Sequence, residues 1–202
     1  MVELGGYSCL IVSRFDREVD AEGGVRRVHQ EDLCQALGID PSGARGRAKY
    51  EQGAAGPSFK QAAELLDAYA ADPLAELDRL VAVVAYTVAI GNADAHGKNL
   101  ALLHPDPERV SLAPLYDTVP TALWPRLRSD AAMAVGGQVA PADVGLEDIV
   151  REARRWSHPA DRARRVAVET LEGIAAAVED GVVPADGRVG QMVAGRCRAL
   201  LA

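Results

Sequence analysis

Residues 80–103 read LVAVVAYTVAIGNADAHGKNLALL, a stretch that joins two kinds of secondary-structure pattern through a polar segment. Its first part is almost wholly apolar and completes a helical pattern over residues 73–90, which indicates a helix at the centre of a helical lobe. Its last part, residues 99–103, has the apolar character of a short strand. The polar junction GNADAHGKN, residues 91–99, therefore lies between a buried helix and a strand, where polar groups point to a functional role.

The rest of the chain predicts further helices around this stretch. Helical patterns cover residues 58–71, 146–156, 159–178 and 186–201, and a shorter one covers residues 29–37. Residues 109–113 form a second strand candidate after the turn-like HPDPE, so we expect a small hairpin with residues 99–103. Residues 41–57 are rich in glycine and proline and predict an irregular loop. The predicted fold is mainly α with a small β component.

Residues 7–14, YSCLIVSR, form an apolar run after the turn signal Gly5-Gly6 and predict a strand with apolar side chains on both faces. Only six residues precede it. A single strand has no ladder partner for its backbone groups, so we expect either a pairing segment within the chain or sheet-forming sequence upstream. Without such a partner, residues 1–16 should fray or self-associate.

Composition excludes several classes of protein. The 202 residues are 49% hydrophobic and 25% charged, a composition typical of one globular domain or of a domain with a fragment. The formal net charge of -7 argues against a protein whose whole surface binds nucleic acid or an anionic membrane. No long apolar run and no signal peptide is evident, so we expect a cytoplasmic protein without a membrane partner. Cys9, Cys34 and Cys197 lack metal-site spacing and are expected to be buried, reduced thiols.

The polar junction carries the spacing that kinases use for phosphoryl transfer. Asp94 and Asn99 follow a buried helix, and Asp117 stands beyond the predicted hairpin. In such sites the first carboxylate orients an attacking hydroxyl, while the amide and the second carboxylate hold magnesium. Asn92 and Asp94 taken singly could also serve only as turn residues.

Several segments resemble one family in the same order along the chain. GNADAHGKNLALL followed by LAPLYD is similar to the catalytic and metal-binding segments of HipA-like serine/threonine kinases, the toxins of type II toxin–antitoxin systems. IVSRFDR at residues 11–17 resembles the hinge strand between the two kinase lobes, and HQEDLCQALG at 29–38 resembles the helix that follows it. KYEQGAAGP at 49–57 and AMAVGG at 132–137 also match.

The resemblance implies a division of the chain, a set of cofactors and a set of site residues. Residues 1–17 would be a remnant of the N-lobe with the hinge strand, and residues 18–202 the C-terminal helical lobe of a protein-kinase-like fold with a catalytic hairpin. ATP and Mg²⁺ would be the cofactors. Asp94 would be the catalytic base, Asn99 and Asp117 the magnesium ligands, and the nucleotide would lie against Arg14, Phe15, Gln30, His96 and Tyr116. Two of these residues have an alternative structural role: His96 as a residue that stabilises the turn, and Tyr116 as a packing residue.

Two hypotheses for function follow. The first is a magnesium-dependent kinase that transfers the ATP γ-phosphoryl group to a serine or threonine of a protein, with tRNA-charging enzymes as the substrate class that the resemblance implies. The second is a non-catalytic module that binds a helix-turn-helix antitoxin of the HipB type or a separate N-lobe polypeptide, with DNA reached only through the antitoxin. A Gly-rich loop and a phosphate-binding lysine do not fit before Tyr7, so weak nucleotide binding by the chain alone is expected. The basic run at 151–165 is expected to form solvated helix faces.

Overall fold

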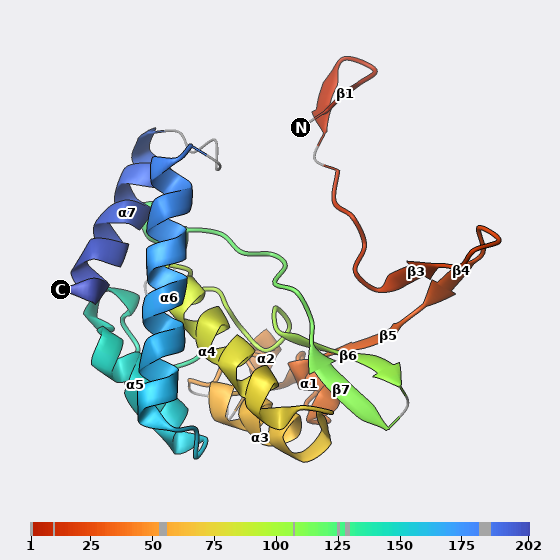
Figure 1. Ribbon diagram of the computed structural model, residues 1–202, viewed down its shortest axis with the longest axis horizontal. Coiled ribbons are helices and arrows are strands. Elements are labelled where there is room, and N and C mark those ends of the chain that lie inside the picture. Colours follow the sequence, from red (N-terminus) through yellow and green to blue (C-terminus); the bar gives the residue numbers. More distant parts are fainter. Residues whose placement is uncertain are drawn as a thin grey trace.

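The computed structural model describes residues 2–9, 11–52, 56–106, 108–124, 126–127, 130–181 and 187–202. An N-terminal arm with two small hairpins leads into a lobe that combines a short sheet with packed helices (Figure 1). The strands are β1 Val2–Leu4, β2 Tyr7–Cys9, β3 Arg17–Val19, β4 Val25–Arg27, β5 His29–Asp32, β6 Ala101–Asp106 and β7 Arg109–Leu112. The helices are α1 Leu33–Ala36, α2 Gly43–Gly46, α3 Phe59–Tyr69, α4 Pro73–Ala89, η1 Thr121–Leu123, η2 Pro141–Asp143, α5 Leu146–Arg155, α6 Ala160–Glu179 and α7 Gly187–Leu201.

Helix α4 forms the centre of the lobe, as its apolar sequence predicts. It begins after Asp72, whose side chain accepts a hydrogen bond from the Ala75 N–H, with Pro73 at the first helical position. Leu80 and Val84 are fully buried, and α4 contacts α3, α5, α6 and α7. Burial on nearly every side explains why so little of this helix is polar.

The other long helices lie within two residues of their predicted bounds, except that residue 186 lies outside the described part of the chain. Helix α3 starts with a capping box in which Ser58 and Gln61 satisfy each other's backbone N–H groups. Helices α6 and α7 pack together on the side of α4 away from the sheet (Figure 1). Within the described residues, no helix has both the length and the apolar character needed to cross a membrane.

The basic run at 151–165 forms parts of α5 and α6, and its arginines face acidic neighbours. Arg151 pairs with Asp148, Arg155 with Glu152, Arg162 with Asp78, and Arg164 with Glu147. These ion pairs neutralise much of the positive charge locally. The expectation of ordinary helix faces in this region agrees with the structure.

Strands β5, β6 and β7 form one antiparallel sheet in that order. Strands β6 and β7 occupy the place of the predicted hairpin, but the prediction of a helix over residues 29–37 was wrong in its first half. His29–Asp32 is strand β5, which pairs with β6, and the helix is only Leu33–Ala36. The Asp32 side chain caps that helix, and the ladder on β6 satisfies the backbone of the preceding residues, so tertiary pairing overrides the local helical pattern.

The N-terminal arm differs from the predicted single strand. Of the described residues in 7–14, Tyr7–Cys9 form a strand, which pairs with Val2–Leu4 across Gly5 and Gly6, both of which have positive φ. The two glycines allow a tight turn, so the residues before them supply the partner. Tyr7 and Val12 are 77% and 69% exposed, which contradicts burial within a larger sheet. Cys9 is half-buried, whereas Cys34 and Cys197 are buried as predicted, and all three are free thiols.

Replacing Leu80 by alanine is expected to lower the free energy of unfolding by about 2–5 kcal/mol, because the cavity would lie in the middle of the core. Leu74→Ala on the same helix is the matched control, since Leu74 is 41% exposed; its effect should stay within about 0.5 kcal/mol. Urea denaturation measures both. An equal loss in the two variants would contradict a core centred on α4.

Candidate active site

The polar loop at residues 91–99 leaves α4 through a turn that demands glycine. Gly91 has a φ of 65°, and a Cβ atom at this position would lie 2.8 Å from the Cβ of Ala122. The Thr121 hydroxyl accepts a hydrogen bond from the Ala93 N–H at 2.7 Å and donates one to the Gly91 carbonyl at 3.1 Å. Thr121 is buried, so these bonds hold the start of the loop in the interior.

Three more segments hold the loop by its backbone. The Gly97 N–H donates to the Lys49 carbonyl, and the Gly97 carbonyl accepts from the Leu33 N–H. The Ala132 N–H donates to the Ala93 carbonyl. A Cβ atom on Gly97 would lie 2.4 Å from the Cγ of Pro57, so the loop approaches its neighbours as closely as glycine allows. Contacts from this many distant segments fix the loop in one conformation.

Asp94 and Asn99 come together within this loop. The Asp94 carbonyl accepts hydrogen bonds from the His96 N–H at 2.8 Å and from the Asn99 side-chain amide at 3.1 Å. Asn99 is buried, whereas Asp94 is exposed. Because the amide nitrogen of Asn99 is used, its Oδ1 is the atom that can be offered to a cation. The Asp94 carboxylate accepts a hydrogen bond from the Tyr50 hydroxyl at 3.2 Å.

His96 is buried beneath these groups, with its ring edge-on to Tyr50 at a centroid distance of 5.3 Å. Burial lowers the pKa of His96, and the nearby Lys49 charge lowers it further, while the carboxylates of Asp94 and Asp117 act in the opposite direction. The ring is therefore neutral near pH 7. Among the described residues, its buried Nδ1 has no hydrogen-bond partner. Asp94 and Asp117 thus both lie within electrostatic reach of one imidazole.

Tyr116 joins the segment after β7 to the same loop. Its hydroxyl donates to the Lys98 carbonyl at 2.6 Å, and burial, followed by the charges of Asp32 and Asp117, raises the pKa of Tyr116 to about 12. Asp117 is exposed and has a φ of 51°, a left-handed conformation that costs a non-glycine residue about 1–3 kcal/mol and that is common at functional sites. The Lys98 side chain pairs with Asp32 at 3.2 Å.

The other predicted site residues, Arg14, Phe15 and Gln30, differ in how they lie relative to this site. The ring of Phe15 lies 6.3 Å from that of Tyr116, centroid to centroid. Arg14 is exposed and forms a two-point ion pair with the Asp16 carboxylate, which holds the pKa of Asp16 well below its usual range. Gln30 lies in β5 opposite Leu103. The structure thus brings Phe15 to Tyr116, whereas among the described residues no side-chain hydrogen bond or ion pair joins Arg14 or Gln30 to the loop.

Tyr50 and Thr121 also belong to the site, although no pattern in the sequence indicates them. Tyr50 belongs to the segment KYEQGAAGP, which the sequence marks as a loop without indicating what its tyrosine contacts. Thr121 belongs to a short turn with no chemical motif. In both cases the signal lies in the contact with the polar loop, which only the folded chain shows.

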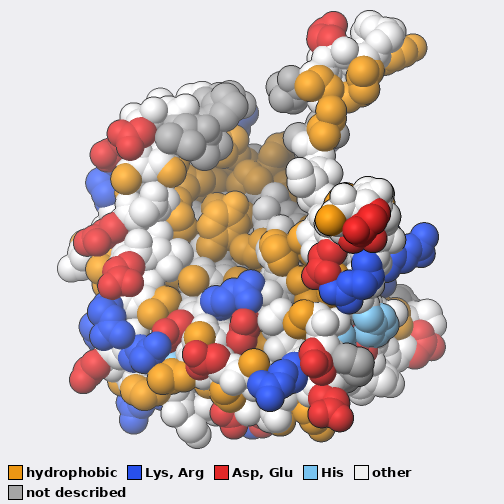
Figure 2. All heavy atoms as spheres, turned by 45° about the vertical axis from the view of Figure 1, so that its right-hand side comes forward, with side chains coloured by type: hydrophobic (Ala, Val, Ile, Leu, Met, Phe, Trp, Pro, Cys, Tyr) orange, Lys and Arg blue, Asp and Glu red, His pale blue; other side chains and the backbone are white. Residues whose placement is uncertain are grey.

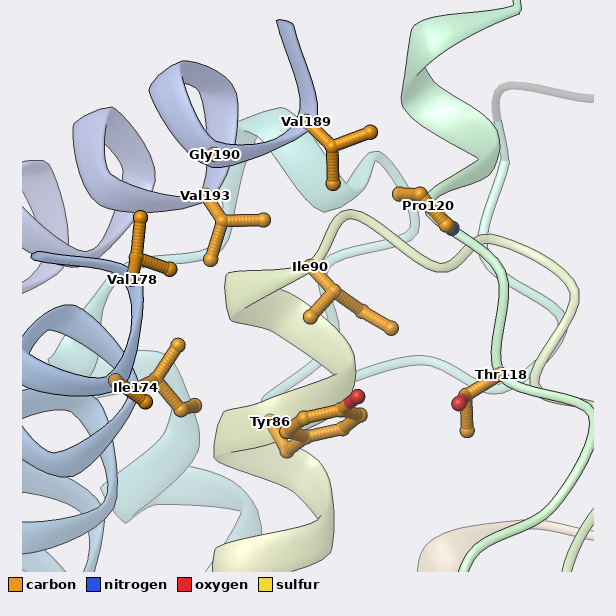
Figure 3. Close-up of a pocket in the computed structure, with 10 residues that line it drawn as sticks. Tyr86, Ile90, Thr118, Pro120, Ile174, Val178, Val189, Gly190 and Val193 are labelled. Carbon is orange, nitrogen blue, oxygen red and sulfur yellow. The ribbon is translucent and has the colours of Figure 1, made fainter. Parts of the chain in front are cut away.

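An apolar cavity of about 190 Å³ lies beyond the site, between α4, α6, α7 and the segment after Asp117. Tyr86 and Ile90 of α4 lie between Thr118 and Pro120 on one side and Ile174, Val178 and Val193 on the other (Figure 3). None of the predicted site residues lines this cavity. The described residues that line it are mostly apolar, with Thr118 and Tyr86 as the side chains that carry a hydroxyl.

The fold and the loop define a kinase-like helical lobe. Across 93% of this chain, the structure aligns with a TM-score of 0.77 and 24% identity to a chain of the HipA, HipB and operator DNA complex of the Shewanella oneidensis toxin–antitoxin system. Residues 1–181 match the model of the HipA-like C-terminal domain, and the chain belongs to this family.

Two curated relatives agree with this assignment. The chain is 38% identical over 180 residues to a Sinorhizobium fredii protein named "Putative kinase Y4mE", and the match covers 87% of this chain and 41% of that one. It is 31% identical over 155 residues to the serine/threonine-protein kinase toxin HipA of Shewanella oneidensis, covering 71% of this chain and 34% of that one. The chain therefore spans less than half the length of these relatives.

Thr121→Val is expected to destabilise the protein by about 1–3 kcal/mol, because valine keeps the shape but leaves the buried Ala93 N–H without an acceptor. Thr121→Ser keeps the hydroxyl and is the matched control. Hydrogen exchange at the Ala93 amide is the direct measurement. Exchange should accelerate in the valine variant alone; equal exchange in both variants would show that the hydroxyl does not hold the loop.

The pKa of His96 in the folded protein is expected to lie below about 6.5, the value of an unperturbed histidine. The unfolded chain then binds more protons than the folded one as the pH falls through that value, so stability should decline below it. NMR titration of the histidine rings measures the pKa. His96→Gln should reduce the pH dependence of the free energy of unfolding, and an unchanged dependence would contradict a buried neutral ring.

Proposed function

We propose that this chain is the metal- and substrate-handling lobe of a HipA-type serine/threonine protein kinase toxin, which transfers the γ-phosphoryl group of ATP to a hydroxyl group of a protein substrate. One observation carries the proposal: the Asn99 side-chain amide bonds to the Asp94 carbonyl within the loop, and the Tyr116 hydroxyl, next to Asp117 in the chain, bonds to the Lys98 carbonyl of the same loop. An acid, an amide and a second acid around one loop suit magnesium-dependent phosphoryl transfer.

In this proposal Asp94 is the catalytic base. Its carboxylate is exposed and is oriented by the Tyr50 hydroxyl, so it can accept the proton of an attacking serine or threonine. Asn99 and Asp117 would hold magnesium, because an amide oxygen and a carboxylate are hard oxygen ligands of the kind that Mg²⁺ prefers. When bound, the ion would neutralise phosphate charge. The rigid anchoring of the loop supports such a role, since phosphoryl transfer depends on positioning.

The nucleotide would lie between the arm and the loop. We assign Arg14 and Phe15 of the arm, Gln30 of β5, His96 and Tyr116 to its walls. The approach of Phe15 to Tyr116 supports this assignment. Residues 1–17 would then act as the hinge, and residues 18–202 as the C-terminal lobe.

The remaining parts of the active kinase would come from sequence outside this chain, because the relatives are more than twice as long as the matched region. A Gly-rich loop and a phosphate-binding lysine could be supplied by a separate N-lobe polypeptide. The HipA and HipB named in the Shewanella complex suggest a HipB-type antitoxin as partner, with operator DNA contacted through it. A cytoplasmic tRNA-charging enzyme is the protein substrate that we propose.

A second candidate function is a partner-binding lobe without catalysis. It is favoured by the arm, whose hairpin β1–β2 exposes Leu4 and Tyr7 and projects away from the helices. Hydrophobic side chains also line the hollow between arm and lobe (Figure 2). A second polypeptide that adds strands to this hairpin would cover both surfaces.

The chain is expected to bind ATP only with magnesium present, because the proposed ligands Asn99 and Asp117 would hold the nucleotide's phosphates through the ion. Calorimetry with and without EDTA measures this. Asn99→Ala and Asp117→Asn should each lower the magnesium-dependent affinity by at least about tenfold. Asp67→Asn, an exposed acid of α3, is the matched control and should leave binding unchanged.

Asp94→Asn separates the two candidate functions. In the presence of an added N-lobe polypeptide, the kinase proposal expects this variant to retain nucleotide binding but to lose phosphoryl transfer by about 10²–10⁴-fold, since only the base is removed. Transfer to the protein substrate from labelled ATP is the measurement. Complete absence of transfer with the unaltered chain, together with formation of a stable complex, would favour the non-catalytic lobe.

A further inference from the structure

Three metal-ligating side chains gather on one face of the sheet, away from the polar loop. His29 of β5 lies directly opposite His104 of β6 in the antiparallel register. Glu31 follows two residues after His29, and alternate residues of a strand share a face. The register of β5 on β6 therefore places two imidazoles and one carboxylate side by side.

The distances agree with this register. The rings of His29 and His104 have centroids 4.9 Å apart, and the Nε2 of His104 lies 2.6 Å from the Oε1 of Glu31. One ligand atom from each of the three residues can be chosen so that all lie within 4.8 Å of one another. Donors of a tetrahedral ion with bonds of about 2.0–2.2 Å lie closer than this, so small side-chain rotations complete the site.

We propose that His29, Glu31 and His104 bind one divalent transition-metal ion, with Zn²⁺ as the representative ion. Two imidazoles and a carboxylate form a donor set that suits zinc, with a fourth position left for water. Magnesium prefers oxygen ligands alone, so this site selects against it. The site is independent of the proposed kinase function, because it shares no residue with the loop at 91–99 or with Asp117.

The site is open to an ion from solvent. The side chains of His104 and Glu31 are 20% and 25% exposed, and His29 is exposed. A hollow of about 340 Å³ lies beside Glu31 and His104, bordered by Leu65, Tyr69 and Glu108, and leaves room for the water ligand. Histidine surface is visible near the β3–β4 side of the molecule (Figure 2).

The position of the site suggests what a bound ion does. Strand β5 is the first strand of the lobe sheet after the arm, and β6 leads out of the polar loop. An ion bound by both strands would cross-link β5, which follows the arm, to β6, which follows the polar loop. Gln30 lies between His29 and Glu31 and faces the opposite side of the strand, so the ion and the proposed nucleotide wall occupy opposite faces of β5.

A zinc titration of the chain, with any histidine tag removed, tests the proposal. Binding of one Zn²⁺ per chain is expected, and His29→Ala, His104→Ala and Glu31→Gln should each weaken it by at least about tenfold, since loss of a ligand costs no less than loss of a residue that supports one. Glu22→Gln removes an exposed carboxylate of the β3–β4 turn and is the matched control. Cys9→Ser in every sample excludes binding by that half-buried thiol.

NMR of the unaltered chain gives a reading that needs no substitution. Zinc should perturb the ring signals of two of the four histidines, His29 and His104, and leave the buried His96 and His158 unchanged. The double variant Asn99→Ala and Asp117→Asn should bind zinc as before, which separates this site from the proposed magnesium site. Three results would each overturn the proposal. They are an unchanged zinc affinity in His104→Ala, a stoichiometry of one ion per two chains with a dimer in sedimentation, and the absence of saturable zinc binding.

Discussion

The structure depends on hydrogen-bond partners for the backbone of the polar loop that follows the buried helix α4. Helix α4 ends in the core, and the next residues cannot reach water for their hydrogen bonds. The hydroxyl of Thr121 and the backbones at Leu33, Lys49 and Ala132 supply those partners instead. Each partner comes from a different part of the chain, so satisfying this one loop draws the arm side of the sheet, the irregular loop and the segment beyond β7 into one place.

The same arrangement of the loop determines which ionisable side chains of the site are exposed and which are buried. The loop backbone is buried, but its turn directs Asp94 to the surface while His96 stays inside. The buried ring is kept neutral mainly by desolvation, and the carboxylates around it are exposed and free to meet a cation or a hydroxyl group. The left-handed backbone at Asp117 adds local strain, which the hydrogen bond from Tyr116 to the loop helps to stabilise.

Side chains alternate between the two faces of strand β5, and the two faces carry different kinds of residue. One face carries Gln30, assigned to the proposed nucleotide wall, and the other carries His29 and Glu31 beside His104 of β6. The proposed ligands at the loop are all oxygen atoms, whereas two of the three proposed ligands on the sheet are imidazole nitrogens. The two proposed ions therefore differ in hardness as well as in position, and neither site competes for the ligands of the other.

The long helices, the region of the hairpin and the loop with Asp94, His96 and Asn99 could be predicted from the sequence, because these features follow from hydrophobic period and turn chemistry within short windows. Spacing also indicated Asp117, and the family resemblance indicated Arg14, Phe15, Gln30 and Tyr116, whose roles are proposals. The folded chain was needed to show that residues 29–32 form a strand, that Val2–Leu4 pairs with Tyr7–Cys9, and that Tyr50 and Thr121 bond to the polar loop. Those outcomes depend on which distant backbone or side chain is available as a partner, and no local pattern carries that information.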